Sequence, residues 1–400
     1  MFLTSTLYIA LAIFGLALVY KVSTWFRYKI GIPSIEIRTS ERFFSALKGI
    51  LLTVFSPKIL TLIKVFILDV LLQLRILKED FLRWLMHLCI YGGFMLLLLM
   101  HALDKYITVA LFDNYYPTIN PFMFLRNLFG VIVILGVAIA IYRRFILKVP
   151  RLMTNAMDIY TIIIVAVIML SGFFLEATKM VAYSDYQRMV NEYSGLSDPQ
   201  ELKALEAYWV KEFGTVSPNL RGPFDEKILA QGRELHQSSC AECHAKPQWA
   251  FAGYGTAKVI SPIGLTIDRA RLPSILWYIH ILACFAGLAY LPFSKMFHIF
   301  TSQLSLLANA VMEKEKSSPA NIATRQVMEL DACTHCGTCS FRCSVAVAFD
   351  EIPNINILPS EKIASVKALA SGKKLSPRAL QNIQEGVYLC TNCYRCTVVC

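Results

Sequence analysis

Ten of the twelve cysteines lie in three short clusters, and two of these clusters repeat one spacing. The pattern Cx2Cx2Cx3C occurs at Cys333, Cys336, Cys339 and Cys343, and again at Cys390, Cys393, Cys396 and Cys400. Thiolates at this spacing hold a [4Fe–4S] cluster, and the fourth cysteine of each run ligates the other cluster. We therefore predict one cluster on Cys333, Cys336, Cys339 and Cys400, and a second on Cys390, Cys393, Cys396 and Cys343. Zinc is the alternative, although zinc sites usually use two CxxC pairs.

The third cysteine cluster is a CxxCH motif formed by Cys240, Cys243 and His244. In this motif two thiols bond covalently to a haem and the histidine becomes an axial iron ligand. We predict one haem c here. The sixth ligand is predicted to be His236, with Met189 and Met180 as alternatives. The competing interpretation is a chance motif or half of a zinc site.

The apolar segment Leu272–Phe300 carries two histidines, His280 and His298, eighteen residues apart. On one continuous helix this spacing is five whole turns, which puts both imidazoles on one face roughly 27 Å apart. That distance approaches the hydrocarbon thickness of a bilayer, roughly 30 Å. The segment is therefore predicted to be a transmembrane helix with one histidine near each membrane surface.

A second apolar segment, Trp84–Tyr106, carries His87 and His101, fourteen residues apart and also near one helix face. Ionisable side chains inside hydrocarbon are costly and mark functional sites. Because the two segments run in opposite directions, we predict that His87 pairs with His298 at the cytoplasmic side, and His101 with His280 at the outer side. Each pair would hold one haem b without an open iron position, which favours electron transfer. The alternative is an ordinary histidine with its hydrogen bonds satisfied in a helix core.

Two basic residues are predicted at the outer ends of their helices, near the haem of His101 and His280. Lys105 and Arg126 are candidates for binding a haem propionate or the carbonyl of a quinone. The alternative is that each side chain extends to the membrane surface as an anchor.

The composition indicates a membrane protein with soluble parts. The chain is 56% hydrophobic and 17% charged, with a mean hydropathy of +0.51. We predict an all-α fold with five transmembrane helices, at about Phe2–Tyr20, Trp84–Tyr106, Phe122–Tyr142, Met157–Ala177 and Leu272–Phe300. The segment 43–77 contains Pro57 and several charges, and is predicted to form two helices in the cytoplasmic membrane interface.

The distribution of basic residues predicts the orientation of the chain. Basic residues follow the first span and none precedes it, so the N-terminus is predicted outside and the C-terminus inside. Residues 1–177 then hold four spans, 178–271 form an extracytoplasmic c-haem loop, and 272–300 form the fifth span. Residues 301–330 are a cytoplasmic linker and 331–400 a mostly helical ferredoxin domain. The net charge of +11 fits basic cytoplasmic loops of a bacterial inner-membrane protein, and no pattern indicates nucleic-acid binding.

The five spans and the two histidine-bearing helices resemble the cytochrome b subunit of respiratory nitrate reductase. They also resemble the related subunits of membrane-bound heterodisulfide reductase and of the Dsr complex. The cysteine repeat resembles the iron–sulfur subunits of heterodisulfide reductase and succinate dehydrogenase. In those iron–sulfur proteins a proline and further helix follow the last cysteine, so we expect either a sequence truncated after Cys400 or a split gene. The c-haem loop departs from the nitrate reductase pattern.

The resemblance implies a membrane-bound respiratory electron-transfer subunit with two haems b and two [4Fe–4S] clusters, to which the CxxCH motif adds one haem c. Its expected partners are membrane lipid, the menaquinone pool, a periplasmic c-type cytochrome and a cytoplasmic iron–sulfur or flavin subunit, such as a heterodisulfide-reductase-like catalytic subunit. One alternative is a quinone reductase that accepts electrons from an electron-transferring flavoprotein. Others are the electron-input part of a disulfide reductase and a zinc-binding structural anchor.

Overall fold

The computed structural model describes residues 2–31, 36–112, 115–313 and 315–399, and regular secondary structure in these ranges is entirely helical. The chain forms two compact units. Unit 1 comprises Met1–Leu85, Ala140–Ile162 and Phe285–Cys400, and unit 2 comprises Met86–Ile139 and Ile163–Cys284. Four of the long helices contribute residues to both units.

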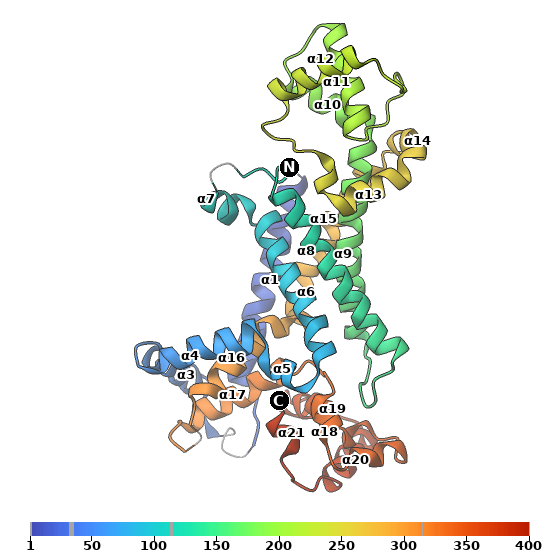
Figure 1. The fold of residues 1–400 in the computed structure, drawn as a ribbon. Coiled ribbons are helices and arrows are strands. Elements are labelled where there is room, and N and C mark those ends of the chain that lie inside the picture. The colour runs from blue at the N-terminus through green and yellow to red at the C-terminus, as the bar shows by residue number, and fades with distance from the viewer. Residues whose placement is uncertain (1, 32–35, 113–114, 314, 400) are drawn as a thin grey trace. The chain divides into compact units, whose positions relative to one another are not determined.

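Among the described residues, five helices are long and apolar enough to cross a bilayer, which confirms the predicted all-α membrane architecture (Figure 1). Each supplies the roughly 20 residues that a span requires. They are α1 (Phe2–Arg27), α6 (Phe81–His101), α8 (Phe122–Ile141) with the π-helical turn Tyr142–Ile146, α9 (Ala156–Val181), and α15 (Leu272–Tyr290) with the 3-10 turn Leu291–Phe293.

The prediction of one continuous helix from Leu272 to Phe300 is wrong. The α-helix α15 ends at Tyr290, two 3-10 turns follow, and a separate helix α16 (His298–Val311) begins at His298. Pro292 has no backbone N–H to continue the helix, and Ser294 is extended with φ −94° and ψ 172°. His280 and His298 therefore belong to different helices, and their eighteen-residue spacing does not place them on one shared face.

The segment predicted as two interfacial helices forms α3 (Thr39–Val54) and α4 (Lys58–Val65), the latter continuing as a π-helix to Leu71. The two helical stretches meet at an angle of 93° on either side of residues 55–57. Large apolar side chains such as Phe44 and Phe55 are exposed on them. A third helix, α5 (Leu74–Glu79), begins within the same segment, and the location of these helices in the cytoplasmic interface stays a prediction.

Helix α17 (Pro319–Ala332) connects the N-terminal part of unit 1 to the C-terminal part. Asp331 of α17 accepts a hydrogen bond of 2.8 Å from Trp25 Nε1 and forms a 2.8 Å ion pair with Lys21 Nζ, both from α1. It also pairs with Lys367 of α19 (Pro359–Ala370). The carboxylate is almost fully buried, with 4% of its side chain exposed. Burial alone raises the pKa of Asp331, but Lys367 and Lys21 outweigh this effect, so the pKa lies below its ordinary value.

A second buried charge joins α17 to α3. The guanidinium of Arg42 donates to Thr324 Oγ1 at 3.2 Å, to the carbonyl of Ala323 at 3.1 Å and to the carbonyl of Tyr28 at 2.6 Å. Arg42 is 1% exposed, so these bonds replace the water that the guanidinium would otherwise bind. Thus the fold of unit 1 depends on polar contacts between residues about 300 positions apart, as well as on apolar packing.

The segment that follows α9 in unit 2 forms a small helical domain, here called the loop domain (residues 182–271). Its helices are α10 (Tyr183–Tyr193), α11 (Pro199–Glu212), α12 (Glu226–Ser239), α13 (Phe251–Ile260) and α14 (Gly264–Arg269). Helices α11 and α12 cross closely at Gly232, where an added Cβ would lie 2.2 Å from the carbonyl oxygen of Ala204. Glycine is therefore required at position 232 for this crossing.

The C-terminal cysteine repeat lies in unit 1 on short helices and loops. After α17 come α18 (Thr338–Arg342), α19, α20 (Pro377–Tyr388) and α21 (Arg395–Val398), with short 3-10 turns at Ala346–Asp350 and Ile355–Ile357. Helices α18 and α21, each within one cysteine run, pack against one another. The predicted, mostly helical character of residues 331–400 is confirmed for the described part.

We predict that Asp331→Asn destabilises unit 1, because the amide leaves the largely buried ammonium of Lys21 without a counter-charge. Removing one partner of a buried pair costs about 3–5 kcal/mol. Thermal unfolding of the detergent-solubilised protein should therefore begin at a clearly lower temperature. Glu351→Gln, at an exposed position of the same unit, is the control and should leave the midpoint unchanged. An unchanged midpoint for Asp331→Asn would contradict this role.

Candidate redox sites

His101 and His280 come together in unit 2. His101 is the last residue of α6 and His280 lies in α15, and their ring centroids are 6.1 Å apart with an interplanar angle of 62°. The predicted pairing of these two histidines is therefore matched by their proximity.

The ring of His280 is oriented by α9. Its Nδ1–H donates to the carbonyl of Ile168 at 3.0 Å and lies 3.1 Å from Ser171 Oγ. A proton on Nδ1 leaves the lone pair of a neutral imidazole on Nε2. Nδ1–H bonds of this type usually fix the tautomer and the orientation of metal-binding histidines. His280 is thus prepared to bind a metal through Nε2.

The Nδ1 atom of His101 accepts a hydrogen bond, whereas the Nδ1 atom of His280 donates one. Arg126 Nη2 donates to His101 Nδ1 at 3.0 Å. Since arginine is only a donor, a neutral His101 then carries its proton on Nε2. Binding a metal through Nε2 requires Arg126 to turn away from Nδ1. The buried Nε of Arg126 has no hydrogen-bond partner, so this side chain retains an unused donor.

Three further residues were predicted at the membrane sites, and two of them, His87 and His298, belong to different units. His87 is on α6 in unit 2, next to Tyr91, with ring centroids 6.4 Å apart. His298 is in unit 1, where its Nδ1–H donates to the carbonyl of Lys295 at 2.7 Å. The pairing of His87 with His298 stays a prediction. Lys105 is exposed in the π-helical turn Asp104–Thr108 after α6, and its predicted role is likewise untested.

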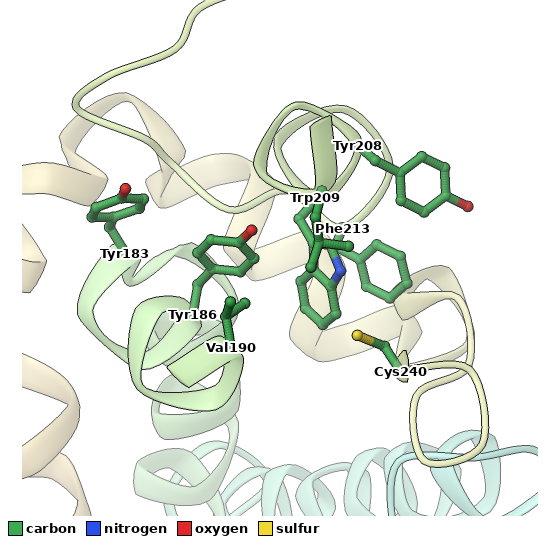
Figure 2. Close-up of a cluster of buried hydrophobic side chains, with 8 residues drawn as sticks. Tyr183, Tyr186, Val190, Tyr208, Trp209, Phe213 and Cys240 are labelled. Carbon is green, nitrogen blue, oxygen red and sulfur yellow. The ribbon is translucent and has the colours of Figure 1, made fainter. Parts of the chain in front are cut away.

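The CxxCH motif follows α12 and adjoins an aromatic core. This core contains Tyr186, Val190, Leu205, Tyr208, Trp209, Phe213 and Cys240, with Tyr183 beside them (Figure 2). Trp209 lies between the two histidines of the region, with ring centroids 5.8 Å from His236 and 5.6 Å from His244. Cys240 and His244 of the motif, and the predicted sixth ligand His236, thus lie at the same aromatic core.

Two buried polar atoms in this core have no hydrogen-bond partner, His236 Nδ1 and Trp209 Nε1. Burial, with a smaller effect from His244, lowers the pKa of His236 to about 4, so its imidazole is neutral at physiological pH. Native proteins rarely leave buried polar atoms unpaired unless a ligand, water or ion satisfies them. A neutral histidine with an unpaired nitrogen beside Cys240 fits an additional group bound in this core.

The two CxxCxxC loops have the same unusual backbone at equivalent positions. The residue before the second cysteine is left-handed in both loops, with φ 50° at His335 and φ 51° at Asn392. The residue after the second cysteine is left-handed as well, with φ 78° at Gly337 and φ 58° at Tyr394. Bulky residues rarely adopt this conformation, and such strain is concentrated at functional sites. The internal repeat is therefore present in the backbone as well as in the sequence.

The two cysteine runs approach one another. Ser344, next to Cys343 of the first run, places its Oγ 3.5 Å from Cys393 Sγ of the second run. The hydroxyl of Ser344 and the amide of Arg395 lower the pKa of Cys393 to about 7, which favours the thiolate that metal ligation needs. Described cysteines form no disulfide. Within the described ranges no three Cys, His or carboxylate groups are gathered around one point, and Cys400 lies outside those ranges.

The first cysteine loop is held against the start of α6. Arg83 donates to Thr338 Oγ1, and an added Cβ on Gly337 would lie 3.3 Å from Leu152. The same loop lines a cavity of about 260 Å³ through Cys336, Gly337 and Thr338. The cavity is otherwise rich in charged residues, which are Glu79, Asp80, Arg83, Arg143 and Arg342. The loop of Cys336 therefore contacts the chain at one end of a transmembrane helix.

Unit 2 contains a polar group that the sequence patterns above did not predict. Glu176 of α9 accepts hydrogen bonds of 3.2 and 3.1 Å from Asn127 Nδ2 of α8. Asn127 Oδ1 in turn accepts from the backbone N–H of Gly253 at 3.1 Å. The available signal was the presence of a carboxylate at the far end of the fourth span from Asp158, since such residues are rare in transmembrane helices.

Comparisons with known proteins match two regions of the chain. Residues 63–196 match the model of the HdrE family of dihydromethanophenazine:CoB--CoM heterodisulfide reductase, and residues 329–400 match the model of the 4Fe-4S dicluster domain. Neither match includes the CxxCH motif at 240–244. No solved structure matches the chain.

Individual relatives agree with these regions. The chain is 32% identical over 125 residues to the HdrE protein of Methanosarcina barkeri, covering 30% of the chain and 48% of the relative. It is 22% identical over 375 residues to the EtfAB:quinone oxidoreductase of Syntrophomonas wolfei, covering 82% of the chain and 45% of the relative. The chain thus spans about half the length of the curated relatives it matches. It is a multi-pass membrane protein with an HdrE-like region, a C-terminal 4Fe-4S dicluster domain, and relatives among oxidoreductase subunits.

Proposed function

We propose that this chain is a membrane electron-transfer subunit that carries electrons between the quinone pool and a cytoplasmic iron–sulfur or flavin partner. The electrons would pass through two haems b and two [4Fe–4S] clusters, and a haem c in the loop domain would exchange electrons with a periplasmic c-type cytochrome. The observation that carries this proposal is the geometry of His101 and His280.

The separation of these two imidazoles suits one metal between them. A ligating nitrogen lies about 2 Å from its metal and about 1.1 Å from its ring centre, so two rings on opposite sides of one metal have centroids about 6 Å apart. The observed distance is 6.1 Å. His280 and His101 would hold the iron of one haem b through Nε2, and Arg126 would be released to a propionate. Two axial imidazoles suit electron transfer because no iron position stays open.

The second haem b is proposed on His87 and His298. Burial lowers the pKa of His298, and its Nδ1–H is already bonded to Lys295, so its Nε2 has the lone pair that ligation needs. Arg83, which binds the first cysteine loop, precedes His87 by one helical turn on α6.

The dicluster match and the repeated left-handed residues support the predicted ligation of the two clusters. Cys333, Cys336, Cys339 and Cys400 would hold one cluster, and Cys390, Cys393, Cys396 and Cys343 the other. The contact between Ser344 and Cys393 supports the exchange of the fourth ligand between the two runs. For the haem c, Cys240 and Cys243 would be the attachment points and His244 and His236 the axial ligands.

A second candidate function is quinone reduction with electrons from an electron-transferring flavoprotein. The relative named EtfAB:quinone oxidoreductase covers 82% of the chain, and this similarity favours the second candidate. The purified protein with reduced electron-transferring flavoprotein should then reduce a menaquinone analogue without any c-type cytochrome. Reduction only when a c-type cytochrome is supplied would reject this direction in favour of the first proposal.

We predict that His101→Ala and His280→Ala each remove one of the two haems b. The dithionite-reduced b absorbance per protein should fall by about half, because each substitution removes one axial ligand of a single haem. Cys284→Ala is the matched control, since Cys284 Sγ lies 3.9 Å from His280 Nε2 and has no proposed ligand role. A full b spectrum in His280→Ala would refute the ligand assignment.

Replacing Cys333 by serine should remove one of the two iron–sulfur clusters. Non-haem iron per chain should fall from about eight atoms to about four, because one of two four-iron centres loses a thiolate ligand. Cys89→Ser, at an isolated cysteine in α6, should retain the full content. Iron analysis and EPR of the reduced protein provide the measurement, and bound zinc in place of iron is the contrary result.

The double variant Cys240→Ala/Cys243→Ala should lose all covalently attached haem. Haem staining after denaturing electrophoresis detects this loss, since only thioether-bound haem survives denaturation. His236→Ala should keep the covalent haem but change its low-spin spectrum, because one axial ligand is missing. An unaltered low-spin spectrum in His236→Ala would reject His236 as the sixth ligand and favour Met189 or Met180.

A further inference from the structure

Glu176 lies on the face of α9 that reaches His280. One helical turn earlier, a Cβ added to Gly172 would lie 3.2 Å from His280 Cε1. Residues four apart share one face of a helix, so Glu176 and the contact at Gly172 point the same way. Most of the span is strongly apolar, with Asp158 and Lys179 near its ends, and a carboxylate within a span is a functional signal.

The carboxylate is held in a fixed chain of hydrogen bonds. Gly253 in the first turn of α13 donates its N–H to Asn127 Oδ1, and Asn127 Nδ2 donates to both oxygens of Glu176. Because Asn127 Oδ1 is occupied as an acceptor, the amide can only donate to Glu176. The N-terminal end of α13 adds positive partial charge nearby. This arrangement fixes the positions of the two carboxylate oxygens of Glu176.

Helix α13 packs onto α9 so closely that it also sets the position of Glu176. Ala177 and Val181 of α9 share a buried core with Ala257 of α13. A Cβ added to Gly253 would lie 2.2 Å from Glu176 Oε2, whereas one added to Gly255 would have nothing within 4 Å. Alanine at position 253 must therefore displace the carboxylate, and alanine at position 255 does not.

The segment that places Gly253 against Glu176 also carries aromatic residues, and a nearby cation acts on the carboxylate. Arg126 is the charged side chain that acts on Glu176, and it also donates to His101. Phe124 of α8 contacts Trp249 and Phe251, with ring centroids 6.2 and 5.8 Å apart. The rings of Trp249 and Phe251 are 52% and 40% exposed. Ligand sites for flat, largely apolar molecules typically combine such apolar walls with a few fixed polar groups.

We propose that Glu176 is the group that exchanges a proton with the hydroxyl of a quinol at this site. Oxidation of one quinol to quinone releases two electrons and two protons. A haem b held by His101 and His280 would supply the acceptor that takes the electrons one at a time and passes them on. The carboxylate of Glu176 would accept the proton of one hydroxyl as its O–H bond breaks, and the proton of the other hydroxyl would pass to water. When a quinone is reduced, the proton on Glu176 returns to the quinone oxygen. This inference rests on the proposed quinone-linked function.

The test compares the full-length, haem-loaded protein with three variants, using menadiol as the electron donor. Stopped-flow absorbance measures the rate of haem b reduction. Glu176→Gln should slow it by roughly 100-fold, within the usual contribution of one proton-transfer group. Gly253→Ala should slow it by roughly 10-fold or more because the carboxylate is misplaced. Gly255→Ala should match the wild type within about twofold.

The outcomes separate this inference from the proposed function. Wild-type haem b that menadiol fails to reduce rejects the quinone-linked function and the inference together. Normal reduction of Glu176→Gln rejects the inference alone.

A second readout does not depend on turnover. Infrared difference spectra of the wild type on reduction by menadiol should show a carboxylic acid band that shifts in D2O and is missing from Glu176→Gln. If Glu176→Gln loses its haem, the wild-type spectrum decides, and absence of that band overturns the inference.

Discussion

The structure depends on one constraint, that a polar group inside hydrocarbon needs a partner within the protein. An unsatisfied polar group there costs several kcal/mol. In unit 2 two polar side chains of the spans follow this rule, whereas the buried Nε of Arg126 has no partner. His280 bonds to Ile168 and Ser171, and Glu176 bonds to Asn127. These contacts orient the imidazole and the carboxylate, so the requirement to satisfy polar groups also prepares the sites for their chemistry.

Unit 1 follows the same rule with buried charges. Asp331 and Arg42 have partners that come from α1, α3, α17 and α19. These contacts join the first transmembrane helix to the domain that contains the cysteine repeat. Arg83 at the start of α6 binds Thr338 within the first cysteine run. Electron-transfer centres need a fixed separation, and these polar contacts provide fixed positions for the loops that would hold the clusters.

The sequence predicts the features that local patterns determine. Apolar runs of sufficient length predict the five spans, and the cysteine spacing predicts a repeat whose two loops have equivalent left-handed residues at 335 and 392. The break at Pro292 was missed because apolar residues resume after Ser294 and Lys295 and continue to Phe300, and hydropathy does not register a missing N–H. The contact of Glu176 with Asn127 and Gly253 was also missed. It joins residues up to 126 positions apart through close packing, which no local pattern reports.

The most direct test of ligation by paired histidines is the spin state of the haems in the purified, oxidised protein. EPR combined with an optical redox titration distinguishes iron with two imidazole ligands from iron with an open position. We expect low-spin ferric signals from two haems b, both reducible by a quinol analogue. High-spin signals, or a protein that contains zinc and no haem b, would contradict the claim that paired histidines inside the membrane hold the electron-transfer centres.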